Sequence, residues 1–60
     1  MDTLYDADTA EPIGPATPEQ VAASDAAGDE GIILVDGDGD VVAPGGFGAE
    51  QARRCYTMPA

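Results

Sequence analysis

Residues 31–43 read GIILVDGDGDVVA, and this stretch predicts a β-hairpin. Its first half, at 32–35, is a short, β-branched, apolar run bounded by glycines, which is typical of a strand. The Asp-Gly pairs at 36–39 favour a tight turn, because glycine tolerates the positive φ that such turns require. The chain then returns through residues 40–43 as a second strand, and Pro44 ends it.

The first strand of this hairpin is apolar on both of its faces. Side chains alternate along a strand, so Ile32 and Leu34 point one way and Ile33 and Val35 point the other. A chain with one short helix covers only one face of its sheet. The other face is expected to be covered by the N-terminal segment, by a second copy of the chain, or by another protein.

The best helix signal lies at residues 17–28. Thr17 suits the N-cap, Pro18 suits the first helical position, and Gln20 completes a capping box three residues after Thr17. The body is rich in alanine, which favours helix, and Gly28 supplies a stop. The helix is expected to lie on the sheet through a flat, small apolar face. The members of that face are Ala22, Ala23, Ala26 and Ala27, with Val21 at its margin.

These elements predict a single small α+β domain spanning residues 1–60. We expect one short helix packed on a small, three-stranded, mainly antiparallel sheet with a marginal core. Within the N-terminal segment, residues 3–8 are compatible with a short strand. Two prolines and a glycine at 12–15 exclude a central strand there, so residues 11–13 are expected to form a short edge strand or an extended arm. The glycine-rich loop is expected to be anchored by Phe47. The expected segments are an N-terminal arm at 1–16, the helix at 17–28, the hairpin at 31–43, the loop at 44–52 and a last strand at 53–58.

Charge and composition limit the classes of function. The 60 residues hold 12 carboxylates against two arginines, a formal net charge of −10. This charge repels phosphates, so direct binding to DNA, RNA or an anionic membrane is not expected. Leu, Ile, Val and Phe together supply only ten residues. So small an apolar content indicates either a very economical core or a fold that a partner or self-association completes. Arg53 and Arg54, the only cations, point to opposite faces of their strand. The favoured interpretation is that both are solvated on an edge strand, and the alternative is that one pairs with an exposed carboxylate while the other lies in an interface.

Three aspartates in the hairpin turn, Asp36, Asp38 and Asp40, alternate as in the first half of an EF-hand calcium loop. The EF-hand pattern then requires glycine at its sixth position and glutamate at its twelfth. This chain has Val41 and Phe47 there. The favoured interpretation is therefore a solvated turn, with a calcium-binding module as an alternative.

Cys55 is the candidate nucleophile, since its arginine neighbours would lower the pKa of the thiol. The chain has no histidine to act as base, so a core role for Cys55 is favoured. A chain of this size leaves no room for a substrate pocket. We predict no catalytic residue, no cofactor and no small-molecule substrate, and we do not expect an enzyme. A single cysteine and the absence of any apolar run near the roughly 18 residues of a membrane helix favour the cytoplasm.

Four segments carry a resemblance to other proteins: Tyr5–Thr9, Glu11–Gln20, Gly31–Gly37 and Arg53–Tyr56. Together they resemble small, uncharacterised, acidic proteins of high-GC actinobacteria, some of which occur on plasmids, integrative elements or phages. In those proteins the Val-Asp-Gly turn runs almost directly into the Arg-Cys-Tyr strand, whereas residues 38–52 intervene here. The resemblance implies a setting on a phage or mobile element and implies no activity.

The leading hypothesis is a non-enzymatic accessory protein that binds another protein, or a second copy of itself, through the uncovered face or edge of the sheet. A second hypothesis is a nucleic-acid mimic, whose carboxylates occupy the basic groove of a DNA- or RNA-binding protein. The calcium-binding module is the third, and a marginally stable domain without a specific partner is the fourth. We expect the partner contact at Ile33, Val35, Phe47, Arg54 and Tyr56.

Overall fold

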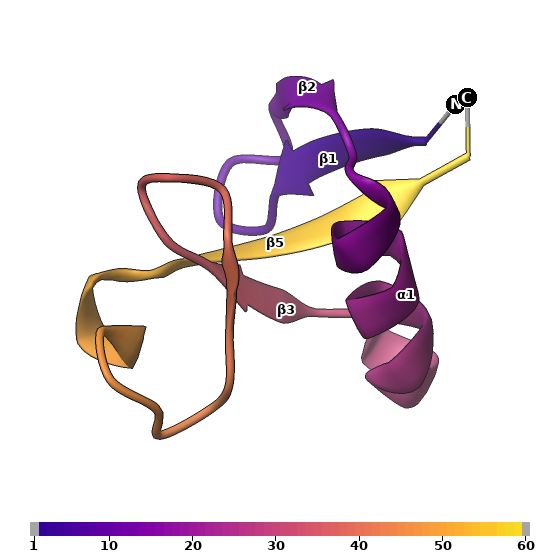
Figure 1. Ribbon diagram of the computed structural model, residues 1–60. Coiled ribbons are helices and arrows are strands. Elements are labelled where there is room, and N and C mark those ends of the chain that lie inside the picture. The colour runs from indigo at the N-terminus through magenta and orange to yellow at the C-terminus, as the bar shows by residue number, and fades with distance from the viewer. Residues whose placement is uncertain (1, 60) are drawn as a thin grey trace.

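The computed structural model describes residues 2–59 and shows a helix lying against one face of a sheet (Figure 1). The strands are β1 (Thr3–Asp6), β2 (Pro12–Pro15), β3 (Ile33–Val35), β4 (Val41–Val42) and β5 (Arg53–Met58). The helix is α1 (Pro18–Ala26), and single 3₁₀ turns occupy Gly28–Glu30 and Ala49–Gln51. The strand order is β2-β1-β5-β3-β4, and every neighbouring pair is antiparallel.

The prediction of an α+β fold with an antiparallel sheet is confirmed, but the sheet has five strands and not three. The extra strands come from the segment that was expected to be an N-terminal arm. A carboxylate oxygen of Asp6 accepts hydrogen bonds from the backbone N–H groups of Asp8, at 2.8 Å, and Thr9, at 3.3 Å. This turn reverses the chain and lets β2 pair with β1. The prolines of β2 are tolerated because β2 is an edge strand.

The C-terminal strand β5 is the centre of the sheet. On one side it pairs with β1, and Tyr56 lies opposite Tyr5. On the other side it pairs with β3, and Cys55 lies opposite Ile33. The expectation that Arg53 and Arg54 belong to an edge strand is therefore wrong. Pairing between the two ends of the chain decides this position, and no local pattern reports it.

The core lies between the sheet and α1 and is very small. Its buried apolar side chains are Leu4, Ile33, Val35 and Cys55. Smaller, partly buried side chains pack against them, namely Ala16, Ala23 and Val41. Because this core buries little apolar area, side-chain hydrogen bonds contribute much to holding α1 against the sheet.

The helix begins as the sequence predicts. Thr17 adopts an extended conformation at the N-cap, and its hydroxyl accepts a hydrogen bond from the backbone N–H of Gln20 at 3.1 Å. The side-chain carbonyl of Gln20 accepts one from the backbone N–H of Thr17 at 2.9 Å. Both halves of the capping box are therefore present. The helix ends at its C-cap residue, Ala27. The next residue, Gly28, has φ of 83°, in the left-handed region that favours glycine.

Two polar side chains, rather than alanines, fix α1 to the sheet. Gln20 and Ser24 are 3% and 7% exposed. The amide nitrogen of Gln20 donates to the carbonyl of Gly39, and the hydroxyl of Ser24 donates to the carbonyl of Gly31, both at 2.8 Å. Gly39 lies in the turn between β3 and β4, and Gly31 lies just before β3. These two bonds therefore tie the helix to the β3–β4 hairpin.

The prediction that an alanine face of the helix is buried is therefore wrong for most of the residues it named. Ala23 is partly buried against the core, whereas Ala22, Ala26 and Ala27 are exposed. Positions 20, 23 and 24 form the face that meets the sheet, at the spacing of one helical stripe. Apolar periodicity cannot reveal this stripe, because two of its three members are polar.

We predict that Gln20→Ala lowers the free energy of unfolding by about 2 kcal/mol, because it leaves the Thr17 N–H and the Gly39 carbonyl without partners. Gln20→Glu keeps an acceptor for Thr17 but loses the donor for Gly39. Urea unfolding followed by circular dichroism measures both. Ala22→Gln, on the exposed side of the helix, is the control and should change stability by less than about 0.5 kcal/mol. A Gln20→Glu variant as stable as the parent would show that the bond to Gly39 contributes nothing.

The turn between β1 and β2 contains a strained residue. Ala10 has φ of 61°, the only positive φ outside glycine in the described chain. Ala10→Gly should therefore raise the free energy of unfolding by about 0.5–1 kcal/mol, since the left-handed conformation costs alanine roughly 1–2 kcal/mol. Ala7→Gly, in the same turn without positive φ, should lower it by a similar amount through chain entropy. Equal shifts for the two glycines in thermal unfolding would contradict this account.

Candidate functional site

One face of the sheet has no helix over it among residues 2–59 (Figure 1). Leu4 and Cys55 point to the covered side, into the core. Their strand neighbours Tyr5, Arg54 and Tyr56 therefore point to the opposite side. We call this second side the open face. On β1, β3, β4 and β5 its strand residues are Thr3, Tyr5, Leu34, Val42, Arg54, Tyr56 and Met58.

The open face is mainly apolar, with half-buried side chains and an aromatic pair at its middle. The rings of Tyr5 and Tyr56 are stacked, with centroids 5.4 Å apart and planes 10° from parallel. In the next rows, Leu34 lies between Val42 on β4 and Arg54 on β5. The guanidinium of Arg54 lies 3.9 Å from the carboxylate of Asp8, and both side chains are well exposed. Tyrosine and arginine on an apolar patch are typical of protein interfaces.

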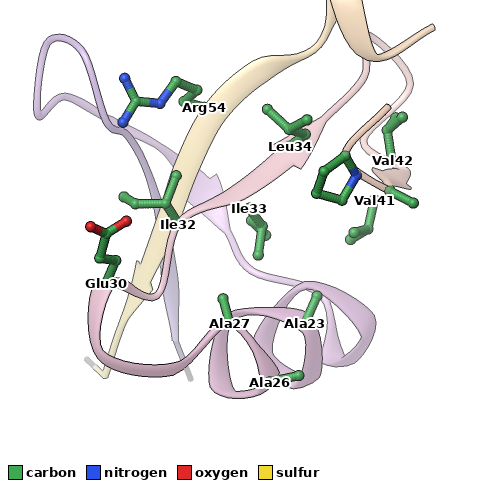
Figure 2. A pocket seen from close by; sticks show the side chains of 12 residues that line it. Ala23, Ala26, Ala27, Glu30, Ile32, Ile33, Leu34, Val41, Val42 and Arg54 are labelled. Atoms are coloured by element: carbon green, nitrogen blue, oxygen red, sulfur yellow. The ribbon is translucent and has the colours of Figure 1, made fainter. Parts of the chain in front are cut away.

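An apolar groove adjoins the open face, where β3 and β4 approach the C-terminal half of α1 (Figure 2). It holds about 540 Å³. Ala27 points from the helix towards the strands, while Ile32 lies between the side chains of Glu30 and Arg54. Those two are the only charged residues that line the groove in the described chain. The groove has room for one or a few apolar side chains of a partner.

The structure separates the residues that were expected to contact a partner. Arg54 and Tyr56 lie together on the open face. Ile33 and Val35 are 6% and 3% exposed beneath α1, so the folded chain does not present them to a partner. This part of the expectation is corrected. The alternation along the strand was predicted correctly, but which of its faces the helix covers depends on tertiary contacts.

Phe47 also departs from its expected role. It is 106% exposed in the loop between β4 and β5, so it anchors nothing. It does not line the groove. The residues that sequence analysis missed on this surface are Tyr5, Ile32, Leu34, Val42 and Met58. Tyr5 becomes visible as a candidate only once β1 is known to pair with β5.

The aspartates of the hairpin turn serve the turn itself. One carboxylate oxygen of Asp36 accepts hydrogen bonds from the backbone N–H groups of Asp38 and Asp40, both at 2.9 Å. Within residues 2–59, no three carboxylate, cysteine or histidine side chains are grouped so that they could hold a metal ion. The geometry thus supports the solvated turn and does not assemble the calcium site considered as an alternative.

Cys55 lies completely buried at the centre of the sheet. Burial raises the pKa of its thiol, the carboxylates of Asp6 and Asp8 add to the rise, and Arg53 opposes it. The thiol is therefore protonated at neutral pH, which suits a small core residue and not a nucleophile.

Comparison of the chain with protein-family models, curated proteins and solved structures finds no match. In the part of the chain that the structure describes, no helix has the length and apolar character needed to cross a bilayer.

The burial of Cys55 leads to a prediction about its reactivity. At pH 8 iodoacetamide should alkylate the folded chain at least about 100-fold more slowly than the chain in 6 M guanidinium, because only opened molecules expose the thiol. Mass spectrometry of the time course measures both rates. An exposed comparator on the outer side of the helix, Ala22→Cys with Cys55→Ala, should react much faster in the folded state. Rapid labelling of the parent without denaturant would contradict the described core.

Proposed function

We propose that this chain is a non-enzymatic accessory protein that binds another protein through its open face. The observation that carries the proposal is the stacked Tyr5–Tyr56 pair within an apolar surface that no helix of residues 2–59 covers. A core of so few buried side chains leaves much apolar area for a partner to bury. Aromatic side chains on such a patch are the usual anchors of binding energy.

Charge supports a protein partner with a basic surface. Arg53 lies 3.9 Å from a carboxylate oxygen of Asp6, and Arg54 lies at the same distance from Asp8. Both cations are thus already close to carboxylates of the chain, and the net charge of −10 is left uncompensated. Such a surface repels phosphates and attracts Lys- and Arg-rich proteins. The same proposal places the protein in the cytoplasm, in the setting of a phage or mobile element.

A second candidate function, imitation of a nucleic acid, is favoured by the exposure of the carboxylates. Of the 12 acidic residues, nine are exposed: Asp8, Glu11, Glu19, Asp25, Asp29, Glu30, Asp38, Asp40 and Glu50. A mimic would bind through these charges and not through the tyrosines, so its affinity would fall steeply with salt and ignore substitutions on the open face.

The proposal predicts which substitutions abolish binding. Tyr56→Thr keeps a strand-forming residue but removes an aromatic anchor, so affinity for the partner captured from the source cells should fall at least about tenfold. Met58→Thr, at a half-exposed position of the same face, should weaken binding without affecting the core. Capture of the same protein by each immobilised variant is quantified by mass spectrometry.

Val21→Thr, on the helix, is the matched control and should bind within about twofold of the parent. Unfolding curves confirm that each variant is folded under the binding conditions. Equal capture by the parent, Tyr56→Thr and Met58→Thr would contradict binding through the open face. If the three proteins capture equally and all capture is lost in 0.5 M salt, imitation of a nucleic acid is favoured instead.

A further inference from the structure

The groove beside α1 combines an apolar floor with an acidic end. Asp25 lies in the last turn of α1, and Asp29 and Glu30 belong to the 3₁₀ turn that follows. Glu30 lines the groove directly. The C-terminal end of a helix carries negative partial charge, so carboxylates there are unfavourable to the chain itself. The last turn of α1 has no basic residue to offset them.

The single cation on the groove lining does not neutralise this end. Arg54 lies on the far side of Ile32 from Glu30, as Figure 2 shows. Its guanidinium is 3.9 Å from the carboxylate of Asp8. The groove is therefore an apolar hollow whose lining has one carboxylate, Glu30, at the end beside α1. Asp29 precedes Glu30 in the same 3₁₀ turn, and the chain as a whole carries a net charge of −10, so a cationic occupant is favoured there.

We propose that this groove binds a basic amphipathic segment of a partner protein. An apolar side chain of the segment lies against Ala27, Ile32 and Val42, and neighbouring Lys or Arg side chains pair with Asp29 and Glu30. This inference rests on the proposed protein-binding function and specifies the chemistry of the partner.

A second copy of the chain does not supply such a segment. Each copy carries a net charge of −10, so two copies repel one another. The only two cations, Arg53 and Arg54, lie in the central strand of the sheet and are each close to a carboxylate. Charge complementarity therefore favours a basic partner over self-association.

The test is a titration of the ¹⁵N-labelled chain followed by amide NMR spectra. The probe is the capped peptide Lys-Lys-Leu-Leu-Lys-Lys, with Lys-Lys-Ser-Ser-Lys-Lys and Glu-Glu-Leu-Leu-Glu-Glu as matched peptides. We expect the leucine peptide to shift the amide signals of Ala27 and Ile32 and to bind at least about fivefold more tightly than the serine peptide. The acidic peptide should cause no shift.

Two variants locate the effect in the groove. Ala27→Leu fills the hollow with the chain's own side chain, so it should reduce binding of the leucine peptide to the level of the serine peptide. Ala22→Leu adds the same group at an exposed helix position outside the groove and should leave binding unchanged. Glu30→Gln should weaken binding of both basic peptides and reduce its salt dependence.

Equal affinity for the leucine and serine peptides would overturn the inference, because binding would then be electrostatic alone. An unchanged affinity in Ala27→Leu would overturn it as well. A dimer in sedimentation that Ala27→Leu dissociates would assign the groove to a second copy instead. Tyr56 lies outside the groove lining. The two proposals can therefore fail separately. If Tyr56→Thr loses capture of the partner but the leucine peptide does not bind the groove, the proposed function stands and only this docking site is rejected.

Discussion

The amide side chain of Gln20 is the contact on which the arrangement of the fold depends. Its carbonyl completes the cap at the start of α1, and its nitrogen donates to the Gly39 carbonyl in the hairpin turn. Both ends of the group are used while the residue is almost fully buried. Glutamate lacks the donor and lysine lacks the acceptor, so among long side chains only glutamine makes both bonds. With so few apolar core residues, this contact and the Ser24 bond to Gly31 set where the helix lies.

The position of α1 in turn decides which surface is available. Because the helix covers the side of Leu4, Ile33 and Cys55, the tyrosine pair is left on the open face. The same strand β5 contributes to both sides through alternate residues. Both arginines belong to β5, next to aspartates of β1 and its turn. The chain keeps a net charge of −10, which opposes self-association and is the basis for the basic partner that we propose.

Local signals in the sequence predicted the parts of the fold that local interactions determine. The cap at Thr17, the stop at Gly28 and the strand at 53–58 are where composition and spacing placed them. The five-stranded sheet could not be predicted in the same way, because β5 pairs with β1 across almost the whole chain. The buried helix stripe was missed since hydrogen bonds to carbonyls distant in sequence, and not apolar periodicity, select it.

The candidate surface was only half predictable for the same reason. The two-faced character of residues 32–35 follows from strand alternation, but whether Ile33 or Leu34 faces outward depends on where α1 docks. Tyr56 and Arg54 were identified from their strand, whereas Tyr5 lies in a segment whose place beside that strand only the pairing of β1 with β5 reveals. Phe47 was expected to anchor the glycine-rich loop, and its full exposure shows that it does not. Its expected contact with a partner stays a prediction.

The central claim is that Gln20 ties the helix to the hairpin turn and thereby leaves the tyrosine face open. The most direct test is a nuclear Overhauser spectrum of the isolated chain in solution. The account predicts cross-peaks between the Gln20 side-chain amide protons and the Gly39 α-protons, together with cross-peaks between the rings of Tyr5 and Tyr56. Narrow amide dispersion, or ring cross-peaks without any contact from Gln20 to Gly39, would contradict it.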